Sequence, residues 1–298
     1  MSASLQDHGL DYITLTSPHP GAPGPDELDY IRALLAREYF AGQAGMETQR
    51  WGWNGYAGWQ YGPLSWGSRP GGSILRLSGG AARYAPRLKL GSEWKATRVD
   101  LQMTIHLGGM GVDDHIRAAK GDALLARAGK EGRPYKVSYI DGCGDGDTLY
   151  VGSRSSQVFC RVYNKEAEDG YEGSTIGCVR YELEVKAESA ERLWRDVRDA
   201  NDASARGAAL VAATYTVRGL RLPSDLVAAA DVPIAAVVKQ TDLEGRLMWL
   251  EKAVGGVVRK LITSGYGDDV LRALAVEVDD GHLSVASMRD RVGGRDLV

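Results

Sequence analysis

The alternation of polar and apolar side chains in two segments constrains the fold of this chain more than any other feature. Residues 148–165 form two strand-like runs separated by a polar turn, and residues 179–186 form a third run. Successive side chains of a strand point to opposite faces of its sheet. The residues that alternation predicts to share a face are Arg161, Tyr163 and Lys165 in the first segment, and Arg180, Glu182 and Glu184 in the second.

A tyrosine that stands between two cations is suited to meet a phosphate group. We predict that Arg161 and Lys165 lower the pKa of the Tyr163 hydroxyl and hold phosphate oxygens, which prepares the phenol to attack phosphorus. The rival tyrosines fit less well, because Tyr150 shares its face with a glycine and Tyr181 is out of phase with the carboxylates. The alternative is a tyrosine that only packs in its strand.

The carboxylates of Glu182 and Glu184 repel each other on one face of a strand, so the pair requires a cation. The cation is either a basic side chain in a solvated ladder of salt bridges, or Mg²⁺ or Mn²⁺, which prefer oxygen ligands. The basic candidates are Arg161, Lys165 and Arg180. Asp100 is the candidate third acid, since it lies on the polar face of a strand predicted over residues 97–107. That face also carries Arg98, Gln102, Thr104 and His106.

The charge of the chain is distributed unevenly. Its formal net charge is −3, yet the stretch from Arg69 to Lys165 contains sixteen lysines and arginines against nine acidic residues. A basic middle flanked by acidic ends predicts one polyanion-binding face, and ordinary solvated surface is the alternative. Four tryptophans suit either stacking on nucleic-acid bases or packing within a sheet. They are Trp51, Trp53, Trp59 and Trp66.

Several functional classes lack their signatures in this sequence. The chain has no GxxxxGK[ST] phosphate loop, no GxSxG nucleophile elbow and no His-x-His pair. It shows no secretory signal and no apolar run long enough to cross a bilayer, so we expect a cytoplasmic bacterial protein without a membrane partner. The three cysteines lack the close pairing of a zinc site, and we expect Cys160 and Cys178 to be buried thiols.

The order of predicted elements indicates an α+β protein of two pseudo-repeated halves, each a mainly antiparallel sheet covered by helices. We predict an N-terminal half over residues 1–92, a catalytic half with Tyr163 over residues 93–222, and a helical C-terminal region over residues 223–298. The first strand is predicted over residues 11–16. The helices predicted in the two halves cover residues 25–42, 113–128 and 190–205, and residues 208–218 are a further candidate.

Four blocks of sequence are distinctive in combination. They are TLYVGSRSSQVFCRVYNK with the following VRYELEVK, TRVDLQMTI, GYAGW with the following WGSRPGGSILRLSGGAA, and LMWLEKAVGGVVRKL. These blocks resemble the replication initiation factor family, whose members start rolling-circle replication of plasmids, phages and integrative elements. The resemblance covers most of residues 51–265, and the block around Tyr163 is its most specific part.

The resemblance implies a site-specific, metal-dependent endonuclease that nicks one strand of an origin and stays linked to its 5′-phosphate. The catalytic residues implied are Tyr163 as the nucleophile, with Arg161 and Lys165 at the scissile phosphate. The implied ligands of Mg²⁺ or Mn²⁺ are Asp100, Glu182 and Glu184, and DNA contacts are expected from Arg98, Arg154 and Arg180.

The resemblance also implies partners. Members of the family act as dimers on a hairpin or cruciform origin and on single-stranded DNA, and the freed 3′-OH primes a host polymerase while a UvrD-like helicase unwinds the duplex. We therefore expect a homodimer that binds origin DNA and such a helicase. Two other functions stay open: a conjugative relaxase of an integrative element, and a non-catalytic protein that binds an origin hairpin. An interaction protein with a coincidental Tyr/Glu pattern is a third and weaker alternative.

Overall fold

The structure is a computed structural model, and it describes residues 3–41, 47–128, 135–170, 173–220 and 222. All of these residues belong to the compact unit Met1–Ile234. The helices predicted over residues 223–298 lie outside the described residues. The predicted division of the chain into three regions therefore stays a prediction.

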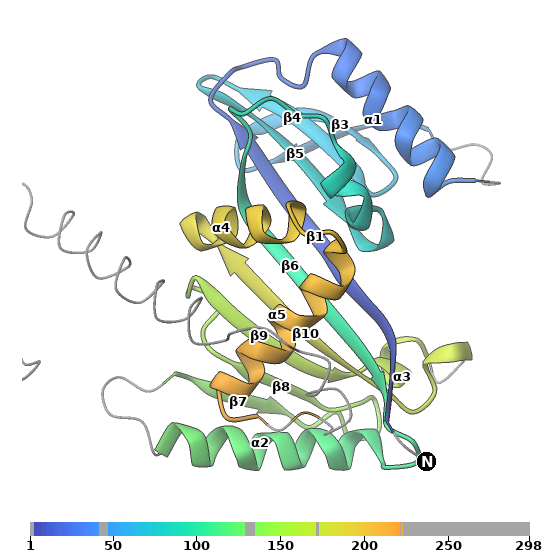
Figure 1. The fold of residues 1–298 in the computed structure, drawn as a ribbon, viewed down its shortest axis with the longest axis vertical. Coiled ribbons are helices and arrows are strands. Elements are labelled where there is room, and N and C mark those ends of the chain that lie inside the picture. The colour runs from blue at the N-terminus through green and yellow to red at the C-terminus, as the bar shows by residue number, and fades with distance from the viewer. Residues whose placement is uncertain (1–2, 42–46, 129–134, 171–172, 221, 223–298) are drawn as a thin grey trace, which may run out of the picture. The chain divides into compact units, whose positions relative to one another are not determined.

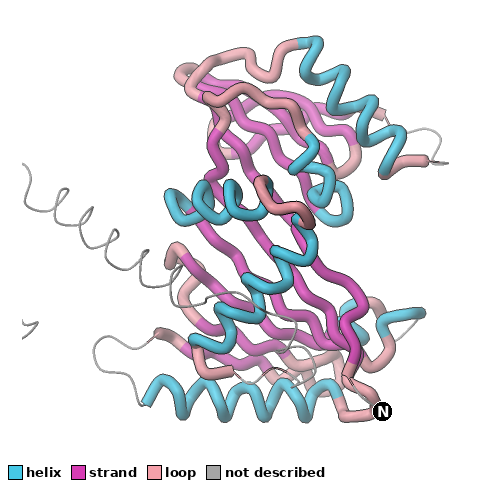
Figure 2. The backbone as a smooth tube through the Cα atoms, viewed as in Figure 1, coloured by secondary structure: helices cyan, strands magenta, loops and turns pink. Residues whose placement is uncertain are grey.

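The described strands form one ten-stranded antiparallel sheet in the order β2-β3-β4-β5-β1-β6-β10-β9-β8-β7 (Figure 1 and Figure 2). The strands on the β1 side are β1 (Ser4–Ser17), β2 (Gln49–Trp53), β3 (Tyr56–Tyr61), β4 (Leu64–Arg69) and β5 (Gly72–Ser78). The strands on the β6 side are β6 (Lys95–His106), β7 (Val137–Ile140), β8 (Thr148–Val151), β9 (Val158–Asn164) and β10 (Cys178–Lys186).

The sheet is an internal repeat. In each half a long strand is followed by a helix and then by four strands, the last of which returns to pair with the long strand. The two long strands, β1 and β6, pair with each other antiparallel at the centre. The α+β class and the two pseudo-repeated halves are thus confirmed, and the structure adds that both halves share one continuous sheet.

Helices cover one face of this sheet. They are α1 (Pro25–Glu38), the 3₁₀ helix η1 (Gly79–Arg87), α2 (Val112–Ala128), α4 (Ala187–Arg198) and α5 (Ala203–Val217). In Figure 1 α5 runs across β1, β6 and β10, with which it is in contact. The covered face is apolar, and its central side chains Ile13, Leu101 and Tyr181 are completely buried. Two further short elements, α3 (Lys165–Glu168) and η2 (Gly173–Thr175), lie between β9 and β10.

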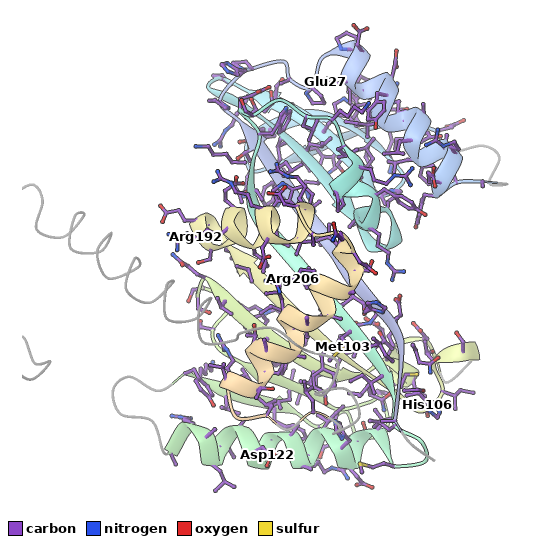
Figure 3. The ribbon with its side chains drawn as sticks, viewed as in Figure 1. Glu27, Met103, His106, Asp122, Arg192 and Arg206 are labelled. Atoms are coloured by element: carbon purple, nitrogen blue, oxygen red, sulfur yellow. The ribbon has the colours of Figure 1, made fainter. Side chains whose placement is uncertain are left out.

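The boundary predicted between the helices over residues 190–205 and 208–218 is wrong, because the first helix ends at Arg198 and the second begins at Ala203. The break comes before Asp202, whose side chain accepts hydrogen bonds from the backbone N–H groups of Ser204 and Ala205 and so caps α5. Arg206 of α5, which is labelled in Figure 3, pairs with Asp196 of α4 through two hydrogen bonds of 2.9 and 2.8 Å, which fixes the two helices against each other.

A smaller prediction concerns the cysteines. Cys160 and Cys178 are buried free thiols, as predicted, and Cys143 is exposed. No described helix combines the length and the apolarity that a bilayer-spanning segment requires.

Tyr215 of α5 joins the apolar face to the backbone of two central strands. Its ring is completely buried, and its hydroxyl donates to the carbonyl oxygens of Arg161 in β9 and Glu182 in β10, at 2.8 and 2.6 Å. These are the strands that carry the candidate tyrosine and acids, so Tyr215 stabilises the backbone of the site from the helix-covered face of the sheet.

We predict that Tyr215→Phe lowers the free energy of unfolding by about 1 kcal/mol, the usual net value of one buried hydrogen bond. Urea denaturation measures the change. Tyr30→Phe is the matched control, because the exposed Tyr30 hydroxyl also donates to a carbonyl, that of Arg87. Equal losses in the two variants would show that Tyr215 contributes nothing through burial of its bond.

Candidate active site

The face of the sheet opposite the described helices α1, α2, α4 and α5, which we call the uncovered face, brings a tyrosine and acids together across β9, β10 and β6. In the strand register Tyr163 lies opposite Arg180, Glu182 lies opposite Arg161, and Glu184 lies opposite Asp100. Side chains opposite each other in antiparallel strands point to the same face. The faces predicted from alternation are therefore present, and the register joins them into one surface.

Tyr163 donates a hydrogen bond from its hydroxyl to Glu182 Oε1 at 2.7 Å. The other carboxylate oxygen of Glu182 accepts from Arg161 Nε at 3.0 Å and also pairs with the Arg161 terminal nitrogen. The Arg161 guanidinium lies 4.7 Å from the centre of the Tyr163 ring. The carboxylate of Glu182 therefore binds both the phenol of Tyr163 and the guanidinium of Arg161. Tyr163 is only 6% exposed.

The predicted lowering of the Tyr163 pKa is wrong. Burial of the phenol raises its pKa well above the ordinary value, and the negative charge of Glu182 raises it further, while Arg180 opposes the shift. Arg161 does not reverse the shift, because its charge is offset by its pairing with Glu182. In this structure the phenol therefore keeps its proton and shares it with Glu182.

Lys165 does not lie in the strand with Tyr163, contrary to the prediction. The strand ends at Asn164, whose side chain accepts a hydrogen bond from Ala167 N at 2.9 Å and caps the short helix α3. Lys165 is the first residue of that helix, and its Nζ lies 2.6 Å from both Glu168 and Asp169. The side chain directly across from Tyr163 is Arg180, which donates to Thr104 at 2.8 Å.

The remaining acids form a second unit around Arg98. One guanidinium nitrogen of Arg98 lies 2.6 Å from Asp100 and 2.7 Å from Glu184, and Lys186 lies 2.5 Å from the other oxygen of Glu184. Burial, with the charges of Glu184 and Glu182, raises the pKa of Asp100 to about 6 although Arg98 opposes the shift. The carboxylates are thus close enough to repel one another, and basic side chains hold them together.

The sequence left two kinds of cation open for Glu182 and Glu184, a basic side chain or a divalent metal ion. The salt-bridge ladder exists, and its cations are Arg161, Arg98 and Lys186. Within the described ranges no group of three or more His, Cys, Asp or Glu side chains is placed to hold a metal ion. The oxygen donors suit Mg²⁺ or Mn²⁺ chemically, but a metal would have to displace Arg98 to bind Asp100 and Glu184 together.

Asp11 also belongs to this surface, although the sequence predicts it only as the start of a strand. A register shift between Leu10 and Tyr12 of β1 marks an irregularity at this position. Burial and the charge of Glu182 raise the pKa of Asp11, while Arg180 is the main opposing charge. Alternation could not have found Asp11, because a bulge changes the face to which a residue points.

The rival tyrosines and Arg154 lie outside the cluster formed by Tyr163, Glu182 and Arg161. Tyr181 lies on the helix-covered face, fully buried and hydrogen-bonded to His115, so it has no access to a substrate. Tyr150 lies opposite Arg161 on the uncovered face and stacks on Phe159, with no described contact to Glu182. Arg154, in the β8–β9 turn, lies 5.9 Å from the Tyr150 ring, whereas Arg98 and Arg180 lie within the site itself.

Comparisons with known proteins fit this picture. The model of the replication initiation factor family matches residues 94–274. Among solved structures, the chain is similar to the rolling circle replication initiator protein from Geobacillus stearothermophilus, with 19% identity, a TM-score of 0.47, and coverage of 66% of this chain and 80% of that one. No curated protein matches the chain significantly.

We predict that the Tyr163–Glu182 hydrogen bond contributes measurably to folding. A double-mutant cycle of Tyr163→Phe and Glu182→Gln should give a coupling free energy of about 1–3 kcal/mol, because the acceptor is charged. Urea denaturation of the four proteins measures it. The control cycle pairs Tyr150→Phe with Glu182→Gln, and its coupling should stay below about 0.5 kcal/mol. Similar values in both cycles would mean that the bond to Tyr163 is absent in solution.

Proposed function

Because the chain belongs to the replication initiation factor family, we propose that it is a rolling-circle initiator that nicks one strand of an origin through Tyr163. The observation that carries this proposal is the 2.7 Å hydrogen bond from the Tyr163 hydroxyl to Glu182, on a sheet face that also holds several cations. A phenol next to a carboxylate has a base for its proton, and nearby arginines suit a phosphate.

In the proposed reaction Glu182 acts as the general base. It takes the phenol proton as the Tyr163 oxygen bonds to phosphorus, and the bond from phosphorus to the 3′-oxygen breaks with its electron pair going to that oxygen. The 3′-oxygen takes a proton from solvent and leaves as a hydroxyl. The products are a 5′-phosphotyrosine and a free 3′-OH, and rejoining reverses these steps.

Cations of the site would bind the scissile phosphate. Arg180 is the best placed, since it lies opposite Tyr163 and, among the described carboxylates, is paired with Asp7 alone, at a long distance of 3.8 Å. Arg161 and Lys165 are the further candidates, although each is now paired with acidic side chains. A phosphate that draws Arg161 away from Glu182 would make that carboxylate a stronger base at the moment of attack.

A divalent cation fits the second acidic unit better than the first. Both oxygens of Glu182 are engaged by Tyr163 and Arg161, so Asp100 and Glu184 are the side chains that would hold Mg²⁺ or Mn²⁺. A bound divalent cation would polarise the phosphoryl oxygens. Arg98, which now neutralises both carboxylates, would be free to contact the DNA backbone.

The location, oligomeric state and partners of the protein are proposed from its family. We propose that the protein works in the bacterial cytoplasm as a homodimer, on a hairpin or cruciform origin and its single strand, and that a UvrD-like helicase extends the opening. The same chemistry serves a conjugative relaxase, for which only the DNA substrate differs. A protein that binds the origin without cleavage is the outcome that the next experiment would reveal.

We predict that Tyr163→Phe abolishes the covalent protein–DNA product while DNA binding is retained. The assay incubates the protein with a supercoiled plasmid that carries the native upstream region, in Mg²⁺ or Mn²⁺, and detects protein-linked nicked DNA after denaturation. Tyr150→Phe is the matched control and should cleave normally, because its hydroxyl makes no described contact to the acids. Cleavage by Tyr163→Phe at the normal rate would remove the assignment, and binding without nicking by the unmodified protein would favour the non-catalytic alternative.

We predict that removal of the metal with a chelator stops nicking, and that Glu182→Ala or Glu184→Ala lowers the rate by orders of magnitude. A second measurement does not depend on activity. Arg98→Met leaves Asp100 and Glu184 without their shared cation, so Mn²⁺ should raise the melting temperature of this variant more than that of the unmodified protein. Equal rates in chelator and in Mg²⁺, or no Mn²⁺ effect on either protein, would argue against a metal at these carboxylates.

A further inference from the structure

The uncovered face continues beyond the acids into the N-terminal half, where it changes to aromatic and basic side chains. This part of the chain lies before the residues that the family model matches, which begin at residue 94. Its members come from β1, β2, β3, β4 and β5. They are Tyr12, Trp51, Trp53, Tyr56, Arg69 and Arg76, which we call the aromatic strip.

Arg76 is the centre of the aromatic strip. Its guanidinium lies 5.2 Å from the ring centre of Tyr12, 5.3 Å from Trp51 and 5.2 Å from Trp53, and its Nε donates to the Tyr12 hydroxyl at 2.5 Å. Arg69 lies 4.4 Å from the ring of Tyr56. Among the described residues neither Arg69 nor Arg76 has a carboxylate within salt-bridge distance, so both charges are available to an anion.

The aromatic strip meets the candidate active site at Tyr12. In the register Tyr12 lies opposite Asp100, and its ring lies 4.6 Å from the guanidinium of Arg98. Arg98 in turn holds Asp100 and Glu184. A chain of contacts therefore runs from Trp51 and Trp53 through Arg76, Tyr12 and Arg98 to Asp100 and Glu184, on the sheet face that also holds Tyr163.

The four tryptophans divide between the two faces of the sheet. Trp53 is 44% exposed and lies with Trp51 on the face of the aromatic strip. Trp59 and Trp66 are cross-strand partners on the other face, where Trp66 is buried under Arg32 of α1. Trp59 is 45% exposed, so it matches Trp53 in exposure and differs from it in the face that it occupies.

We propose that the aromatic strip is a subsite for single-stranded DNA, which holds nucleotides next to the linkage that Tyr163 attacks. This inference rests on the proposed function for the position of that linkage. Exposed aromatic rings stack on unpaired bases of any sequence, and arginines that have no described carboxylate partner attract the phosphates between them. Duplex DNA fits poorly, because its bases are stacked on each other and do not offer their faces to a side chain.

The test measures binding of a fluorescein-labelled single-stranded oligonucleotide by anisotropy. The full-length protein carries Tyr163→Phe in every sample, with chelator present, so that binding is separated from cleavage. Trp53→Ala should weaken binding about fivefold or more, as loss of one base-stacking ring does. Arg76→Gln should weaken it and reduce its dependence on salt. Trp53→Phe should retain most of the affinity, and Trp59→Ala should bind like the parent.

Several results would overturn the subsite. The first is equal affinity of the Trp53→Ala and Trp59→Ala variants for the single strand. The second is an Arg76→Gln variant with the affinity of the parent. The third is a Trp53→Ala variant whose affinity falls as much for a duplex of the same sequence as for the single strand. Thermal denaturation checks that each variant is folded. If the unmodified protein fails to nick DNA but Trp53→Ala still weakens single-stranded DNA binding, the proposed function is wrong and the subsite is retained. If nicking is normal but Trp53→Ala does not change the affinity, the subsite is wrong and the proposed function is retained.

Discussion

The antiparallel pairing of β1 with β6 is the interaction on which the rest of this protein depends. It joins two repeated halves into one sheet, so that a face that begins with tryptophans in one half ends with a tyrosine in the other. Helices cover the opposite face and supply the buried apolar surface that stabilises the fold. The polar face carries the candidate active site, and strand register, not loop conformation, positions its side chains.

Charge on this face is balanced locally. Glu182 pairs with Arg161, whereas Asp100 and Glu184 share Arg98, and Glu184 also pairs with Lys186. Such pairs in partly buried surroundings give little net stability, because desolvation offsets their attraction, but loss of one partner leaves a costly unpaired charge. In the proposed function, a phosphate or a divalent cation would therefore replace a basic side chain that already pairs with these carboxylates.

Strand alternation was enough to predict which side chains of β9 and β10 share a face, and the order of elements was enough to predict two repeated halves. Three features of the site were beyond it. A bulge places Asp11 near Glu182, and the strand ends one residue before Lys165 because Asn164 caps a helix. The sign of the Tyr163 pKa shift depends on burial and on which anion each arginine already binds, and neither is written in the spacing of residues.

The raised pKa of Tyr163 and its proposed role as nucleophile are compatible if the phenol is activated only when DNA is bound. Without DNA, Arg161 neutralises Glu182 and the phenol keeps its proton, so the site does not present a reactive phenolate to water. A phosphate competes with Glu182 for Arg161, since both are anions that suit its guanidinium. In the proposed reaction this competition couples binding to activation, because the carboxylate that loses Arg161 gains affinity for the Tyr163 proton at the time when phosphorus is within reach.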